Sequence, residues 1–211
     1  MWVLLQTLRP LLKHNSISRR TLLLGGGAAL AGCSGRLHGY RRRVGFAVIN
    51  ERLLMHGKVT RRTLRDFSLV MEQNPQITTL VLQDMPGTGD EAATIALGYD
   101  VRARGLEIAL QSDSEIARGA VALFLAGTQR RMVEGAEIDL ASWNDGGVKE
   151  RVLSRGDPAH APLLQYVQDM LGSDEFYWFA LQAAPEGEIY RMTAQEIVHY
   201  GLLTEPVKVW N

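Results

Sequence analysis

Hydrophobic and polar residues alternate in short blocks along most of the chain, and the block lengths predict an α/β protein. Residues 44–49 and 53–56 are β-type apolar runs separated by a polar triplet, which predicts a β-hairpin. Apolar positions then recur at helical spacing over 62–73, after the capping residue Thr60 and before Asn74-Pro75. The opening unit is therefore expected to be a hairpin followed by a helix.

The following blocks repeat a unit of strand, turn and helix. The second unit comprises a strand over 77–82, a glycine-bearing turn over 84–89 and a helix over 90–104. The third comprises a strand over 106–110, a turn at Ser112–Ser114 and a helix over 115–126. Such alternation is typical of parallel β-strands covered by helices.

Shorter blocks complete one predicted domain over residues 43–211. They are strands at 132–133 and 138–140, a polar surface excursion over 144–162, helices over 163–171 and 174–183, and a last helix from 192 to 201. The aromatic run 176–179 is expected in the core, and Arg130-Arg131 is interpreted as a solvated loop pair. A Gly/Ser/Arg-rich stretch over 34–42 is predicted to be a tether to this domain.

Composition and charge exclude several classes of protein. The chain has 211 residues, 46% of them hydrophobic, and its 23 basic and 23 acidic side chains balance. Residues 34–211 alone hold 19 basic and 23 acidic side chains, so the body is mildly acidic and no nucleic-acid partner is expected. Cys33 is the only cysteine, which excludes an intrachain disulfide and a thiolate metal cluster. No His/Asp/Glu spacing indicates a metal site, and no cofactor is expected.

The first 33 residues resemble a twin-arginine export signal. Arg19-Arg20 precedes an apolar stretch over 21–32, which is too short to span a ~30 Å hydrocarbon core. Leu30-Ala31-Gly32-Cys33 matches the lipobox of bacterial lipoproteins, in which the cysteine is lipidated and becomes the new N-terminus. The resemblance implies the twin-arginine export machinery as a partner and a membrane anchor at Cys33, which would hold the protein in the bacterial cell envelope, facing the periplasm or the exterior. The alternative is an uncleaved N-terminal helix beside a buried thiol.

The stretch from Leu80 to Trp143 resembles the Clp-protease and crotonase superfamily, especially a branch of small exported hydrolase-like proteins. The resemblance extends over about residues 43–205 and rests on the order of several short motifs. These are Met85-Pro86-Gly87-Thr88-Gly89, Arg104-Gly105-Leu106, Ile116-Ala117-Arg118-Gly119-Ala120, Phe124-Leu125-Ala126-Gly127, Gly135-Ala136-Glu137-Ile138, Met192-Thr193-Ala194 and Tyr200-Gly201-Leu202. It implies a fold of repeated β-β-α units, with a doubly wound parallel sheet as the alternative. Relatives form trimers and rings, so a homo-oligomer is one option for this chain.

The resemblance also implies where a site would lie. The backbone of Gly87, Thr88 and Gly119 matches the oxyanion-hole region. Arg118 occupies the position of the nucleophilic serine and Ala141 that of the histidine base, while Glu186 or Glu188 could serve as the acid. Arginine cannot act as the nucleophile, so two of the three catalytic positions are replaced.

Other interpretations stay open at this stage. Ser112 or Ser114 could pair with His160 in an active serine hydrolase or peptidase, although Ser114 followed by Glu115 also fits a helix cap. A crotonase-like site could use oxyanion stabilisation alone. Arg118 could fix a carboxylate or phosphate, or could be a solvated helix residue paired with Glu115 or Asp113. The leading hypothesis is a degenerate hydrolase relative that binds a peptide or a small anionic ligand.

Overall fold

The computed structural model describes residues 44–141, 153–184 and 188–207. The chain separates into two units, Met1–His38 and Gly39–Asn211, and every described residue belongs to the second. The predicted export signal with Arg19 and Arg20, the lipidation site Cys33, the tether and Glu186 lie outside the described residues.

The predicted opening unit is confirmed. Strands β1 (Gly45–Ile49) and β2 (Arg52–His56) form an antiparallel hairpin, and helix α1 (Arg61–Gln73) follows. The hydroxyl of Thr63 accepts a hydrogen bond from the Thr60 N–H at 2.9 Å, which ties down the first turn of α1. The helix ends at Asn74, because Pro75 disfavours helical backbone at the residue before it.

The next two units differ from the prediction in one strand. Strand β3 (Thr79–Met85) and helix α2 (Glu91–Ala103) lie close to their predicted ranges. Strand β4 (Glu107–Ala117), however, runs straight through the predicted turn at Ser112–Ser114, and helix α3 (Gly119–Leu125) begins only after it. The prediction of a helix from residue 115 is therefore wrong.

A bulge explains how β4 continues past its serines. The pairing of β3 with β4 jumps from Leu82 with Leu110 to Asp84 with Glu115, so extra residues of β4 are accommodated between these two pairs. The Ser114 hydroxyl donates to the Leu82 carbonyl at 2.6 Å and accepts from the Gln111 N–H at 2.8 Å. It thereby satisfies backbone groups that the bulge removes from the ladder, and it is not a helix cap.

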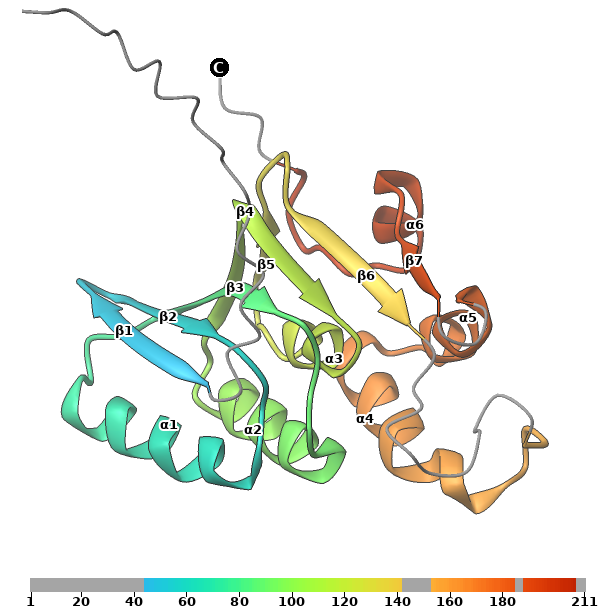
Figure 1. Cartoon of the computed structure of the whole chain (residues 1–211), viewed down its shortest axis with the longest axis horizontal. Coiled ribbons are helices and arrows are strands. Elements are labelled where there is room, and N and C mark those ends of the chain that lie inside the picture. Colours follow the sequence, from blue (N-terminus) through green and yellow to red (C-terminus); the bar gives the residue numbers. More distant parts are fainter. Residues whose placement is uncertain (1–43, 142–152, 185–187, 208–211) are drawn as a thin grey trace, which may run out of the picture. The chain divides into compact units, whose positions relative to one another are not determined.

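The sheet has the order β1-β2-β3-β4-β6-β7, and β5 pairs with β4 beside this path (Figure 1). The first half of β4 is parallel to β5 (Arg130–Met132), and its second half is parallel to β6 (Glu137–Ala141). Strand β7 (Ile189–Arg191), which the sequence pattern does not reveal, adds to β6 in the antiparallel direction.

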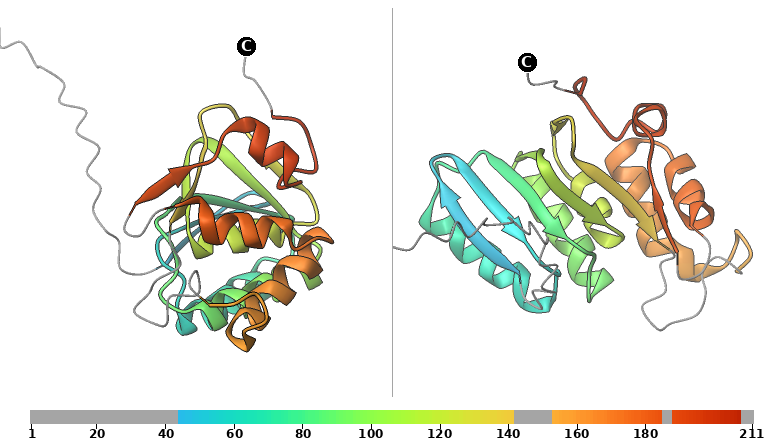
Figure 2. Two further views of the ribbon diagram at one scale, coloured as in Figure 1. Left: turned by 90° about the vertical axis from the view of Figure 1, so that its right-hand side faces the viewer. Right: turned by 45° about the horizontal axis from the view of Figure 1, so that its top comes forward.

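Helices α1, α2, α3 and α4 (Ala161–Leu171) form a layer on one side of the sheet (Figures 1 and 2). The core fills the space between, with side chains such as Leu80, Leu82 and Ile108, and every residue of α3 is buried. This one-sided cover differs from a doubly wound sheet, which has helices on both faces. The described fold is completed by a 3-10 turn (Pro158–His160), helix α5 (Glu175–Ala183) and helix α6 (Ala194–His199). None of the described helices has the length and apolar character needed to cross a membrane.

The aromatic residues 176–179, which were predicted to lie in the core, differ in burial. Phe176 and Tyr177 are buried, whereas Trp178 and Phe179 are half-buried and pack against the core from its edge. The Phe179 ring stacks on Tyr200 with centroids 4.5 Å apart, which joins α5 to the end of α6. Core packing is thus confirmed for the first two residues of the run.

Arg130 is buried, contrary to the prediction of a solvated pair. Its guanidinium donates to the carbonyls of Leu202 at 2.7 Å, Gly127 at 3.0 Å and Gly201 at 3.1 Å. Burial lowers the pKa of Arg130, although the three carbonyl dipoles favour the charged form. The residue therefore fastens the C-terminal segment to β5, while the half-buried Arg131 pairs with Glu107.

Candidate functional site

Two turns and one strand end lie together at the carboxyl ends of the parallel strands. Gly87 and Thr88 follow β3, Arg118 and Gly119 follow β4, and Ala141 is the last residue of β6. Because β3, β4 and β6 are neighbours and parallel, their carboxyl ends lie along one edge of the sheet. In sheets built from parallel strands, ligands bind preferentially outside this edge.

The turn after β3 lies directly against the turn after β4. A Cβ atom on Gly119 would come within 2.2 Å of the Thr88 Cγ2 atom, so glycine is required for this close approach. Gly87 has φ +135°, and a Cβ on it would lie 3.3 Å from the Arg118 Cδ atom. The structure thus places together the four residues Gly87, Thr88, Arg118 and Gly119.

Arg118 occupies a strained turn between β4 and α3. Its φ of 54° and ψ of −126° are rare for a residue with a side chain, and such a conformation costs roughly 1–3 kcal/mol. Its N–H donates to the Asp139 carbonyl at 3.1 Å, and its carbonyl accepts from the Val121 N–H at 2.9 Å. A sharp strand-to-helix turn of this kind presents the nucleophile in serine hydrolases. Here it presents a half-buried guanidinium group.

The backbone N–H groups of two buried residues, Thr88 and Gly119, lie at the contact between the turns. The Thr88 nitrogen is 3.7 Å from the position that a Cβ on Gly119 would take. No described residue accepts a hydrogen bond from the N–H of Thr88 or of Gly119. Paired N–H groups that are left without acceptors inside the protein are the means by which an oxyanion hole holds negative charge.

Hydrogen bonds hold the Thr88 turn in place. The Thr88 hydroxyl accepts from the Asp90 N–H at 3.0 Å and lies 2.6 Å from the Thr94 hydroxyl. Asp90 in turn caps α2, because its Oδ1 atom accepts from the Ala93 N–H at 3.0 Å. The turn is therefore anchored to the start of α2 before any ligand arrives.

Replacing Asp90 by alanine should destabilise the fold by about 1 kcal/mol at neutral pH, the usual value of an N-cap. The hydrogen bond from the Ala93 N–H, supported by Arg61, lowers the pKa of Asp90. A lowered folded-state pKa gives stability that is present above the unfolded pKa and is lost as the pH falls through the folded one. Chemical denaturation of wild type and Asp90→Ala between pH 7 and pH 2 should show the difference shrinking with acid. Asp66→Ala, which removes a more exposed helix carboxylate, is the control; equal pH profiles for both variants would contradict the role given to Asp90.

The end of β6 offers no base. Ala141 is buried, and its methyl group cannot accept a proton. Two residues earlier, Asp139 is only 2% exposed and receives both Nε (2.9 Å) and Nη2 (3.1 Å) of Arg191 from β7. The hydrogen bond to Asp139 raises the pKa of Arg191, which stays protonated. Sequence reasoning missed this pair; the only signal was an acid between two core residues, Ile138 and Leu140.

The serine and histidine residues considered as substitutes do not form a pair. Both hydrogen-bonding roles of the Ser114 hydroxyl are taken by backbone groups. His160 is buried beside α5, where its Nδ1 lies 2.7 Å from the Tyr177 hydroxyl and its Nε2 lies 3.1 Å from the Ser154 carbonyl. Ser112 is exposed on the bulge of β4, and Glu188 is exposed just before β7.

Among the residues that the structure describes, no group of His, Cys, Asp and Glu is arranged to hold a metal ion. The groups that gather at the sheet edge are instead two backbone N–H donors and one guanidinium. This set suits a negatively charged ligand.

No protein-family model and no curated protein matches the sequence. Solved structures do match the fold. AtuE from Pseudomonas aeruginosa is 14% identical, with 79% of this chain and 70% of that chain covered at a TM-score of 0.53. A membrane-bound stomatin-specific protease in complex with a substrate peptide is 14% identical, covering 74% of this chain and 73% of its own at a TM-score of 0.52. The chain has a Clp-protease/crotonase-like fold.

An enoyl-CoA hydratase/isomerase family protein from Silicibacter pomeroyi shares the Clp-protease/crotonase-like fold, with 14% identity, 80% of this chain and 75% of that chain covered, and a TM-score of 0.51. The fold expected from the sequence motifs is thereby confirmed, and the doubly wound alternative is not needed. Because the fold hosts both a protease and hydratase-type enzymes, the activity has to be argued from the site.

Proposed function

We propose that this chain is a degenerate hydrolase relative that binds a carboxylate-bearing ligand, such as a peptide or a small organic anion, without cleaving it. The observation that carries the proposal is the arginine at the strained turn after β4, next to the N–H groups of Thr88 and Gly119, which have no acceptors among the described residues. The fold supports a hydrolase-like ancestry, and the side chains at the site support binding.

The chemistry of arginine favours this choice. A guanidinium stays protonated at physiological pH and has no lone pair with which to attack a carbonyl group. It does form charge-assisted hydrogen bonds with carboxylates, which contribute about 1.5–3 kcal/mol each. The last residue of β6 is alanine, so this position provides no base that could activate a nucleophile or a water molecule.

Ligand binding can be tested on the backbone donors themselves. Titration with acetate should shift the amide NMR resonances of Thr88 and Gly119 in the wild-type protein. Arg118→Gln should weaken acetate binding about tenfold, since it removes a charged partner while keeping most of the side-chain volume. If the two amides do not respond to acetate, the anion-binding proposal fails.

A fluorophosphonate probe tests for residual hydrolase chemistry. The wild-type chain should remain unlabelled, as should Ser112→Ala and Ser114→Ala. Stoichiometric labelling of the wild type that disappears in Ser112→Ala would favour the competing interpretation of an active serine hydrolase.

Restoring the missing pair should restore reactivity. The double variant Arg118→Ser with Ala141→His places a hydroxyl at the strained turn and an imidazole at the end of β6. A general base contributes on the order of 10²–10⁴ in rate, so we expect probe labelling to be about 10²-fold faster than in the parent. Arg118→Ser alone is the matched control and should react far more slowly. A folded double variant that labels no faster than this control would mean that β6 does not present a base to the turn.

We further propose that the protein is exported by the twin-arginine machinery and anchored in the cell envelope through a lipidated Cys33. The support is the order of Arg19-Arg20, a short apolar stretch and a lipobox in the first 33 residues. A ligand bound outside the cytoplasm would more readily be a peptide or a simple organic anion than a coenzyme A thioester.

A further inference from the structure

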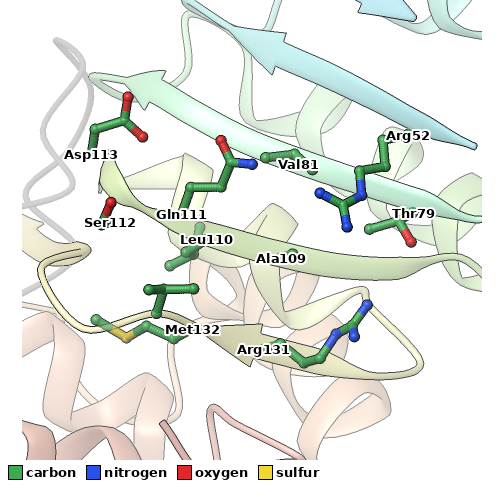
Figure 3. A pocket seen from close by; sticks show the side chains of 11 residues that line it. Arg52, Thr79, Val81, Ala109, Leu110, Gln111, Ser112, Asp113, Arg131 and Met132 are labelled. Atoms are coloured by element: carbon green, nitrogen blue, oxygen red, sulfur yellow. The ribbon is translucent and has the colours of Figure 1, made fainter. Parts of the chain in front are cut away.

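The sheet face opposite the helix layer carries a groove of about 560 Å³ (Figure 3). Its floor is formed by side chains of β3 and β4 that point away from the core, including Val81 and Ala109, and Met132 of β5 closes one side. The groove involves none of the residues at the Arg118 turn.

One end of the groove is basic. Arg52 from β2 and Arg131 from β5 reach over it from opposite sides, near Thr79 (Figure 3). Glu107 neutralises Arg131, and Arg52 has no ion pair within the described ranges. This end therefore carries a net charge of +1, which matches a single carboxylate group.

The other end is acidic. Asp113 and Ser112 are exposed at the bulge of β4, and the described part of the chain supplies no cationic partner for Asp113. Gln111 lies between the two ends and its side chain extends from β4 towards β3 (Figure 3). A primary amide can donate to and accept from a peptide group, so the middle of the groove is suited to a polar backbone over an apolar floor.

The geometry points to a short peptide with free termini as the ligand of this groove. We infer that its carboxylate binds Arg52 and Arg131, its ammonium group binds Asp113, and its central peptide group binds Gln111. Arg131 pairs with Ala109, and the four strand steps from Ala109 to Asp113 cover at most about 13 Å, a path that the bulge shortens. An extended chain advances about 3.3 Å per residue, so a peptide of about three to four residues spans the two charged ends. The small floor residues Val81 and Ala109 leave room for modest apolar side chains. This inference is independent of the function proposed for the Arg118 turn.

Tri-alanine and its two blocked forms test the inference by calorimetric titration of the full chain. Amidation of the C-terminus removes the carboxylate, and acetylation of the N-terminus removes the ammonium group. Each block should weaken binding about tenfold, as expected for the loss of one charge-assisted contact. Arg52→Gln should weaken binding of free tri-alanine to the same extent but leave the affinity for the amidated peptide unchanged. Asp113→Asn should do so for the free peptide but not for the acetylated one.

Arg62→Gln, an exposed arginine of α1, is the control for a general loss of positive charge and should bind all three peptides like wild type. Blocked and free peptides that bind equally well would overturn the inference. So would binding of tri-alanine that is unchanged in both Arg52→Gln and Asp113→Asn, because the peptide would then occupy another place such as the Arg118 turn. Absence of any binding at millimolar peptide would overturn it as well.

Discussion

Substituting both arginines of the N-terminal pair, Arg19→Lys with Arg20→Lys, is expected to abolish export, with the protein retained in the cytoplasm. The reason lies in the recognition chemistry. Arginine presents a planar fork of donors that lysine cannot reproduce, so a receptor that reads the fork loses its contacts although the charge is kept. Cell fractionation with a marker for each compartment measures the outcome. Export of the double variant at the wild-type level would show that the arginine pair is not the export signal.

The cysteine provides a separate test of the same N-terminal segment. Cys33→Ala should be found in the soluble envelope fraction or remain unprocessed, and it should no longer partition into detergent, because burial of acyl chains supplies about 0.8 kcal/mol per CH₂ group. Metabolic labelling with a tagged fatty acid should mark the wild type and not this variant. A wild-type protein that stays unlabelled would rule out the lipoprotein interpretation while leaving the export test intact.

Replacing Arg130 by methionine should cause the largest loss of stability of any single arginine change in the described fold. The variant keeps a long side chain but leaves the carbonyls of Gly127, Gly201 and Leu202 without their charged donor. Hydrogen bonds to charged groups contribute about 1.5–3 kcal/mol each, and the losses overlap, so we expect a net cost of about 3 kcal/mol. For a domain of this size the Tm should fall by about 6–12 °C.

Two comparisons make the Arg130 experiment specific. Arg62→Met removes an exposed arginine from α1 and should change the Tm by no more than about 2 °C, since surface substitutions cost within about 0.5 kcal/mol. Arg130→Lys keeps the charge but loses the planar arrangement of donors, so it should fall between wild type and Arg130→Met. A Tm of Arg130→Met close to that of the control would mean that other contacts hold the C-terminal segment.

The sequence pattern predicted the helices and strands whose positions depend on residues close by in the sequence. The hairpin, α1, β3 and α2 follow from apolar spacing and from turn or cap residues at their ends, and the structure places them within a few residues of the predicted ranges. The motifs around Gly87 and Gly119 also placed two turns that do contact each other. The elements could be predicted because their signals are local in the sequence. The two turns could be predicted because the order of the motifs is typical of the fold.

The failures concern residues whose environment is set by distant parts of the chain. Ser112 and Ser114 are turn formers by local preference, yet the residues before and after them are paired with β3, β5 and β6, so the strand continues through the bulge that holds the two serines. Arg130 is ordinarily a surface residue, and its burial depends on carbonyls about 70 positions later in the chain. Strand β7 is only three residues long and is held by its pairing with β6, so it is too short to show an alternation of apolar and polar residues in the sequence.

The conformation of Arg118 has a consequence for what a substitution at this position would do. Glycine would adopt the same backbone angles without the steric cost, and every arginine codon is a single-nucleotide change away from a glycine codon. A single-nucleotide change would therefore relieve the strain at the cost of the guanidinium. Under the proposed anion-binding function, the strained backbone is what presents this group at the turn, in a role different from that of a nucleophile.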